Sequence, residues 1–314
     1  MKYIIKKTIT ALVTVIAVSF LVFLAFEIIP GDVATKMLGV NATPKKVEAL
    51  REQLGLNRPF LVRYFGTIKD FFTGNMGISY TYYTPVKSLL ADKLPITLTL
   101  TLMSFVFMVI ISIPLGIVTA KYYDRFFAGV IEVVNQLCMA VPPFFIGIVF
   151  TYLFGIVLKL FVPGGFVSYN TDLFGYLGYM IIPSLSIAIP KAAMNMRLLK
   201  NSVLSESKLD YVRTAYSRGC STDRILYKHV LKNALMPVVT FMGMALSDIV
   251  AGSLIIEQVF SIPGFGRLLI TSISNRDYPV AQSIVVIIAI VVIVTNYLVD
   301  IVYTLLDPRI RDEK

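Results

Sequence analysis

Few side chains in this 314-residue sequence combine the type and spacing that metal or catalytic chemistry requires. The one histidine, His229, and the two cysteines, Cys138 and Cys220, are far apart and follow no zinc-ligand spacing. We therefore expect no metal site, and two cysteines are too few for a disulfide framework. The sequence also lacks the GxxxxGK(S/T) loop that cradles nucleotide phosphates, so we expect no catalytic residues and no cofactor in this chain.

A second group of residues has chemical potential because of its apolar surroundings. If those surroundings are a membrane, ionisable side chains within them are functional candidates by default. Asp248 is the strongest of these candidates. Its carboxylate could contact a cationic group of a substrate or a polar residue across a subunit interface, or it could accept a hydrogen bond that only stabilises the fold. We expect Lys191 to snorkel or to pair, and Glu27 and Glu132 to lie near the membrane interfaces. The remaining candidates for lining a path are Asn135, Gln136, Asn195 and Ser247.

The composition indicates what these surroundings are. Apolar residues make up 56% of the chain and charged residues 15%. Soluble domains average about 45–50% apolar, with glycine counted, and about 25% charged. This balance argues against intrinsic disorder, an ordinary soluble globule and a nucleic-acid-binding domain. An integral membrane protein remains, and its net charge of +10 then marks the cytoplasmic side.

Six stretches are long and apolar enough to cross a bilayer as helices, which takes about 20 residues each. The first is too long for the apolar core of a signal peptide. Internal prolines, among them Pro114, Pro142, Pro183 and Pro190, are expected to bend or break spans two to four, as in a packed functional bundle. The six expected spans are 9–29, 94–120, 130–158, 176–199, 237–256 and 280–306.

The distribution of Lys and Arg predicts the orientation. With the N-terminus in the cytoplasm, the short cytoplasmic segments exceed the short external ones by about five to one in basic residues. We therefore expect both termini in the cytoplasm. The resulting segments are 1–29 (N-terminus and first span), 30–93 (external, helical), 94–199 (spans two to four), 200–236 (cytoplasmic loop) and 237–314 (span five, an external segment, span six and the tail).

The cytoplasmic loop has the pattern of two short helices joined by a tight turn. Leu209, Val212, Ala215 or Tyr216, and Gly219 fall on one helical face, and Gly219 can end the first helix. Ser221 or Thr222 can cap the second helix. Such a helix fits a groove on a partner protein, but an amphipathic loop lying on lipid headgroups has the same pattern.

Within this loop, "DYVRTAYSRG" followed by "KHVLKNALMP" resembles the EAA loop of ABC-transporter permeases, in particular the dipeptide, oligopeptide and nickel importers. Arg213 stands where Glu is usual, Thr214 and Ala215 at the two Ala positions, and Gly219 at the Gly. Further stretches are similar to the B-type subunit of that family along the whole chain: "FEIIPGD", "LREQLGLNRPFLVRYF", "GNMGIS", "KLPITLTLTL", "EQVFSIPGFGRLLITSISNRDYPVAQ" and "DPRIR".

The resemblance implies an all-α polytopic protein of the type I importer fold in the cell membrane of a prokaryote. It implies a homologous C-type permease as partner, two cytoplasmic ABC ATPase subunits that carry ATP and Mg, and an extracytoplasmic substrate-binding protein, but no nucleic acid. The residues implied to couple to the ATPase are Asp210, Tyr211, Arg213, Thr214, Ala215, Tyr216, Arg218 and Gly219.

The sequence does not decide the identity of the substrate or the role of one external segment. Di- or oligopeptides are the expected cargo, with nickel or a metal chelate as the alternative in the same family. A stand-alone secondary transporter or channel is the alternative of another class, although the two halves of the sequence show no convincing repeat. The external stretch with Pro263, Gly264, Phe265 and Gly266 is expected either to gate the external mouth or to pack on the bundle.

Overall fold

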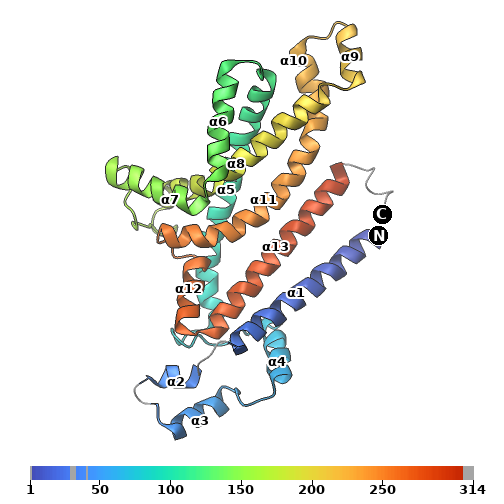
Figure 1. The fold of residues 1–314 in the computed structure, drawn as a ribbon. Helices are drawn as coiled ribbons and strands as arrows, with labels where there is room; N and C mark the ends of the chain where they lie inside the picture. Colours follow the sequence, from blue (N-terminus) through green and yellow to red (C-terminus); the bar gives the residue numbers. More distant parts are fainter. Residues whose placement is uncertain (1, 29–32, 40–41, 307–314) are drawn as a thin grey trace. The chain divides into compact units, whose positions relative to one another are not determined.

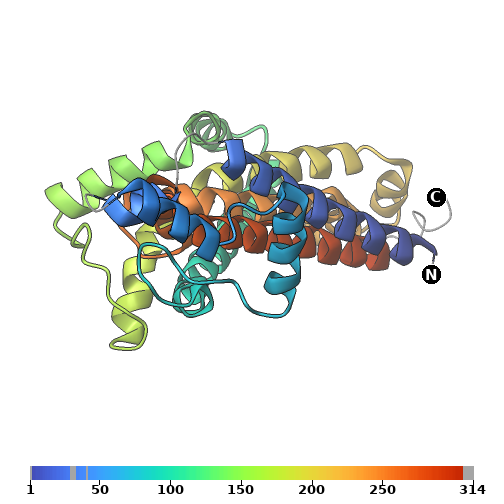
Figure 2. The same ribbon diagram turned by 90° about the horizontal axis from the view of Figure 1, so that it is seen from below.

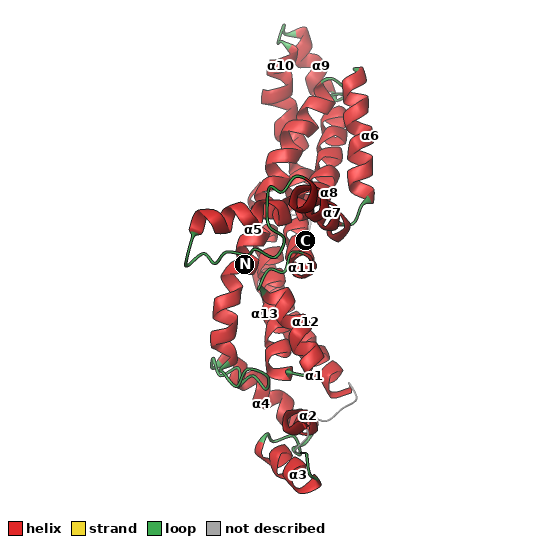
Figure 3. Ribbon diagram, turned by 90° about the vertical axis from the view of Figure 1, so that its left-hand side faces the viewer, coloured by secondary structure: helices red, strands yellow, loops and turns green. Residues whose placement is uncertain are grey.

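The computed structural model describes residues 2–28, 33–39 and 42–306, and within these ranges the regular elements are all helical (Figure 3). The all-α fold class is confirmed. The end of the "FEIIPGD" motif and the "DPRIR" tail lie outside the described residues. The chain forms two compact units (Figure 1), each assembled from separate stretches. The first comprises Met1–Ile96 and Pro263–Val294, and the second Thr97–Ile262 and Thr295–Lys314.

The first unit contains one long apolar helix, α1 (Lys2–Ile28), and three short helices that follow it: α2 (Val33–Leu38), α3 (Pro44–Gln53) and α4 (Phe60–Phe72). α3 begins directly after Thr43, with Pro44 in its first turn, and the Thr43 side chain makes no capping bond. Aromatic rings of α4 pack edge-on against Phe20 and Phe23 of α1. α12 (Phe265–Asn275) and the first part of α13 (Tyr278–Leu306) complete the unit, and there α13 runs beside α1 (Figures 1 and 2).

A single carboxylate holds the loop between α4 and α5 in this unit. Asp277 is fully buried and accepts hydrogen bonds from the Ser79 hydroxyl and from the backbone N–H groups of Tyr80 and Thr81, the latter two at 3.0 and 3.1 Å. Buried charges are stable only when they are this well bonded. The loop is therefore tied to the turn between α12 and α13, almost 200 residues further along the chain.

The second unit is built around α8 (Leu173–Glu206), which packs against α6 (Phe126–Ala140), α7 (Pro143–Phe150) and α11 (Leu231–Val259). Most of α5 (Val86–Lys121) belongs here as well. Asn135 donates to the Ala193 carbonyl at 3.0 Å, and Asn195 donates to the Ser112 hydroxyl at 2.8 Å. Interhelical hydrogen bonds of this kind hold membrane helices together where no hydrophobic effect does.

Within the described residues, five helices are long and apolar enough to span a membrane, and a bent pair brings the number to as many as six. Where the third span was expected, α6 ends at Ala140 and a new helix, α7 continued by the π-helical segment η2 (Thr151–Val157), leaves at 104°. Pro142 and Pro143 cause this break, because residue 141 is pushed to the extended conformation and the next helix begins at Pro143.

The other prolines that were expected to bend or break spans do not break them. α8 continues through Pro183 and Pro190, and α5 is a single helix of 36 residues that includes Pro114. Both prolines of α8 are buried, with α6, α7 and α11 packed around the helix. Neighbouring helices can compensate for a missing backbone bond in this way, so an isolated proline does not end a packed membrane helix.

Candidate functional site

The loop that was predicted to be cytoplasmic folds as α9 (Asp210–Ser217) followed by α10 (Thr222–Ile225), both within the second unit. Val212 and Ala215 are buried, as the helical pattern predicted. Leu209 and Tyr216 were placed on the same face, but they are 46% and 51% exposed. The inner face of so short a helix has room for only two side chains.

The outer face of α9 presents most of the predicted coupling residues to its surroundings. The exposed side chains on this face include acidic, basic, hydroxyl and aromatic groups. Arg213 lies 3.6 Å from Asp210 in an ion pair that is largely solvated. Such a pair contributes little to stability, so both side chains are free to meet another surface. The exposed residues of the predicted coupling set are Asp210, Tyr211, Arg213, Thr214, Tyr216, Arg218 and Gly219.

The turn after α9 is a Schellman motif. Gly219 has a φ of +75°, its N–H bonds the Tyr216 carbonyl at 2.9 Å, and the N–H of Cys220 bonds the Ala215 carbonyl at 3.2 Å. A glycine is required because side chains with a Cβ rarely adopt this φ. Ser221 then caps α10 by accepting from the N–H of Arg224, as one of the two predicted capping residues.

Two hydrogen bonds of Tyr211 fix α9 to the ends of two long helices, and a third bond joins those two ends to each other. The Tyr211 hydroxyl donates to Glu206 at the end of α8 at 2.7 Å. Asn233 of α11 donates to the Tyr211 oxygen at 3.3 Å and to Glu206 at 3.5 Å. Burial, and then the bond to the Glu206 carboxylate, raise the pKa of Tyr211, so the phenol stays neutral at physiological pH. We call the three hydrogen-bonded residues Glu206, Tyr211 and Asn233 the α9 brace.

α10 is also tied to a long helix. Lys121, at the end of α5, lies 2.7 Å from the carboxylate of Asp223. The chain then continues through the π-helical segment η3 (Leu226–Val230) directly into α11. Single π turns inside α-helices are frequent at functional sites. The loop is thus connected to α5 through α10 and to α8 and α11 through α9.

Among the path candidates, Asp248 forms an ion pair with Lys191. The two charged atoms are 2.6 Å apart, and the Asp248 side chain is 62% exposed whereas that of Lys191 is 20% exposed. The expected pairing of Lys191 is confirmed. Ser247, next to Asp248, donates to Asn296 of α13 at 2.8 Å. The pair presents its acidic member outward from the second unit.

The other polar candidates make contacts that do not involve this pair. Asn135 and Asn195 are buried in the helix contacts described above, which favours a structural role for both. The side-chain oxygen of Asn195, Oδ1, is buried without a hydrogen-bond partner. Gln136 is exposed on α6. In the segment that was predicted to be external, Gly264, Phe265 and Gly266 are buried and Pro263 is partly buried, so this stretch packs within the first unit.

Two buried carboxylates were missed by sequence reasoning. Asp277 holds the loop at Ser79, and Glu257, fully buried near the end of α11, lies 2.5 Å from the Thr97 hydroxyl of α5. An ionisable residue at the end of an apolar span was the available signal for Glu257. Asp277 gave no such signal, because its partners are distant in the sequence.

These features define a polytopic helical membrane protein with a braced, surface-exposed helix in the loop between α8 and α11. Residues 112–312 match the family model described as "Binding-protein-dependent transport system inner membrane component", and residues 1–101 match the N-terminal model of the same component. The chain therefore belongs to the permease family of binding-protein-dependent ABC importers, as the resemblance predicted.

Curated relatives extend over essentially the whole chain. A probable peptide ABC transporter permease of Sinorhizobium fredii is 33% identical over 98% of this chain and 99% of its own length. An oligopeptide transport system permease protein of Bacillus subtilis, AppB, is 34% identical over 98% of this chain and 99% of its own. A glutathione transport system permease protein of Escherichia coli, GsiC, is 32% identical over 99% of both chains.

Proposed function

We propose that this chain is the B-type permease subunit of an importer for di- or oligopeptides. With a homologous C-type subunit it forms the translocation path, and two cytoplasmic ATPase subunits, which bind ATP and Mg, drive it. The names of the relatives support the peptide cargo, since those quoted above are permeases for peptides or for glutathione, itself a small peptide. The observation that carries the coupling role is the exposed and braced α9.

The proposed coupling follows from how α9 is held. Its outer face is available for a groove on the ATPase, whereas its inner face and the α9 brace attach it to α8 and α11. A conformational change in the ATPase then moves α9 as a unit with the ends of both helices. Coupling of this type requires a physical connection between the two sites, and the brace supplies one.

The proposed path includes the Lys191–Asp248 pair. The exposed carboxylate of Asp248 suits the ammonium group of a peptide, or a polar group of the partner permease. The buried environment of the pair on the lysine side keeps the acidic group fixed. The proposed topology, with both termini and α9 in the cytoplasm, rests on the distribution of basic residues.

The docking role of α9 can be tested with two tyrosines of similar exposure. Tyr216→Glu places a negative charge on the outer face of α9, where Tyr216 is 51% exposed. Tyr82→Glu makes the same change in the external segment, where Tyr82 is 43% exposed. We expect the ATPase subunits to co-purify with the wild type and with Tyr82→Glu but not with Tyr216→Glu. Normal ATPase retention and uptake in Tyr216→Glu would contradict docking through α9.

The cargo can be tested in the same complex reconstituted with its binding protein. ATPase activity is measured with a dipeptide, a longer peptide, glutathione and nickel in separate reactions. Stimulation by one or more of the peptides supports the proposal, stimulation by nickel alone would replace it with the metal alternative, and uptake without any ATPase subunit would indicate a secondary transporter.

A further inference from the structure

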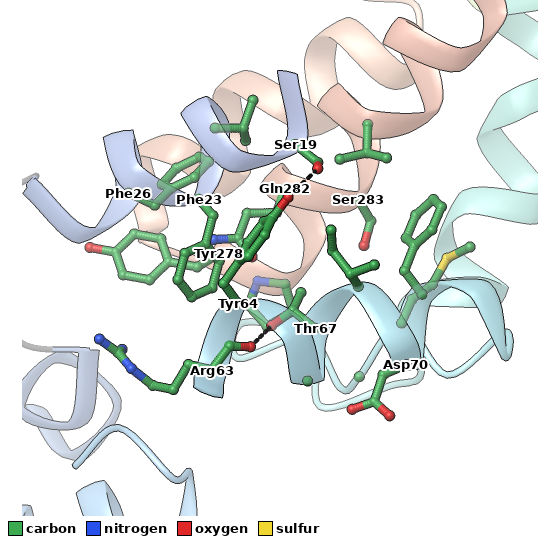
Figure 4. A pocket seen from close by; sticks show the side chains of 18 of the residues that line it. Ser19, Phe23, Phe26, Arg63, Tyr64, Thr67, Asp70, Tyr278, Gln282 and Ser283 are labelled. Carbon is green, nitrogen blue, oxygen red and sulfur yellow. Dashed lines mark hydrogen bonds between the residues drawn. The ribbon is translucent and has the colours of Figure 1, made fainter. Parts of the chain in front are cut away.

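The first unit contains a cavity that the transport mechanism does not use. It lies among α1, α4 and the first turns of α13, with Ser19 and Phe23 on α1, Tyr64 and Thr67 on α4, and Gln282 and Ser283 on α13 (Figure 4). Its volume is about 740 Å³. Small-molecule sites have volumes of about 300–1,000 Å³, so the cavity can hold a sizeable ligand.

The burial of the two long helices that form the cavity walls indicates that the cavity is next to lipid. In the most apolar stretch of α1 only 17% of the residues are buried within the chain, and in that of α13 only 11%. The corresponding values for α5, α8 and α11 lie between 39% and 50%. Among these five helices, α1 and α13 are therefore the least covered by the rest of the chain, and the cavity lies between them.

α4 also has the character of an element in contact with lipid. Its inner face packs Tyr64 against Phe20 and Phe23, with ring centroids 5.2 and 5.6 Å apart. Leu61 and Phe65 do not line the cavity, and their apolar side chains are 57% and 64% exposed. A helix with so wide an apolar face is unfavourable in water, and with the charged residues Arg63, Lys69 and Asp70 on its other side it is typical of the membrane interface.

Basic groups stand at the same cavity. Arg51, Arg58 and Arg63 line it together with only two acids, Glu27 and Asp70. Arg63 pairs with Glu27 through one terminal nitrogen, while its Nε is buried without a hydrogen-bond partner. Guanidinium groups bind phosphate through paired hydrogen bonds, and an excess of them beside an apolar cavity matches a molecule with a phosphate head and a hydrocarbon tail.

We propose that this cavity binds one phospholipid of the surrounding bilayer, with an acyl chain between α1 and α13 and the phosphate near Arg58 and Arg63. The bound lipid fills the space between α4 and the two spans and fixes α4 to the membrane. This site is separate from the α9 brace and from the Lys191–Asp248 pair, so its test does not depend on the proposed function.

Gly66 offers a direct way to fill the cavity. It lies on α4, it lines the cavity, and a Cβ built on it meets no heavy atom within 4 Å. Gly66→Phe therefore occupies the lipid space without a clash along its first bond. Gly129→Phe is the matched control, since Gly129 lies on α6 in the second unit and its Cβ also meets nothing within 4 Å.

The experiment compares the wild-type complex and both variants after reconstitution in nanodiscs of phosphatidylglycerol and phosphatidylcholine. Each complex is transferred to detergent, and native mass spectrometry counts the phospholipid molecules retained. We expect Gly66→Phe to retain one phospholipid fewer per chain than the wild type and Gly129→Phe. Equal retention in all three complexes, or none in the wild type, would overturn the proposal.

A second variant tests the phosphate contact without filling the cavity. We expect Arg58→Gln to lower retention severalfold, because a guanidinium is lost at the head of the site while the apolar walls remain. If Gly66→Phe weakens peptide-stimulated ATPase activity and leaves lipid retention unchanged, the cavity is a substrate site and the lipid proposal is wrong.

Discussion

Gly219 acts through its backbone rather than through any contact. Its φ of +75° is needed for the two Schellman bonds that end α9, and a Cβ at this position meets no neighbouring atom. The position thus selects glycine by conformation alone. The sequence was sufficient to predict this residue, because helix ends of this type have a local signature.

We expect Gly219→Ala to destabilise the turn by about 1 kcal/mol, the cost of a left-handed conformation for a residue with a Cβ. Gly219→Asn should retain more function, because Asn tolerates this conformation better. The measurement is ATPase activity stimulated by substrate in the purified complex. Equal activity in the Ala and Asn variants would show that backbone strain at Gly219 does not control coupling.

The Lys191–Asp248 ion pair gives a second prediction that depends on individual side chains. Removing one charge leaves the other unpaired in apolar surroundings, which is costly. We expect Asp248→Asn to reduce uptake by about tenfold or more, and the double variant Lys191→Gln with Asp248→Asn to fold better than the single one. Thermal stability separates folding from uptake in this comparison.

The double variant also distinguishes the two roles of Asp248. If the carboxylate binds the peptide amino group, the double variant should remain poor for free peptides and discriminate less between free and N-acetylated peptides. Wild-type uptake of all these peptides by the double variant would leave only the structural role. The sequence predicted both residues, but their pairing depends on how α8 packs against α11, which no local pattern encodes.

At the scale of elements, the position of α9 is fixed by its hydrogen bonds to α8 and α11. The α9 brace joins three helices through Tyr211, and its geometry was not predictable, since Glu206 and Asn233 lie on either side of the loop. The break between α6 and α7 shows the opposite case. Two consecutive prolines interrupt a helix regardless of packing, whereas a single buried proline in α8 does not.

We expect Tyr211→Phe to weaken coupling while the complex remains assembled. The ring stays in place, but the bonds to Glu206 and Asn233 are lost, at a cost of about 1 kcal/mol. The measurement is the number of substrate molecules imported per ATP hydrolysed, which should fall severalfold. Tyr216→Phe is the matched control on the same helix, and an equal fall in both variants would mean that the brace has no part in coupling.

At the scale of the whole molecule, hydropathy predicted the membrane segments because each depends on the sum of about 20 residues. Contacts between distant segments were not predictable in this way. Asp277 meets Tyr80, and Glu257 meets Thr97, across 197 and 160 residues. Both pairs depend on the assembled helices, so the two units could not be defined from the sequence.

The first of these contacts gives a pH prediction for the fold. Burial, then Asp277 and then Tyr278, raise the pKa of Tyr80 from 10.0 to about 12. The folded chain therefore holds the phenolic proton more tightly than the unfolded chain does. The corresponding stability, about 2–3 kcal/mol, is fully present below about pH 10 and is lost as the pH rises towards 12.

This prediction can be checked by thermal unfolding of the purified complex between pH 9 and pH 11. We expect the melting temperature of the wild type to fall more steeply over this range than that of Tyr80→Phe, which has no proton to lose. Parallel curves for the two proteins would show that Tyr80 does not contribute to the alkaline loss of stability.

The continuity of α8 has a mechanical consequence. Its 34 residues make a rod of about 50 Å, at about 1.5 Å per residue, and its last residue, Glu206, holds Tyr211 of α9. On a lever of that length, a tilt of about one degree displaces the far end by about 1 Å. Motions of a few ångströms at α9 therefore require rotations of only a few degrees, which packed helices accommodate by small sliding movements.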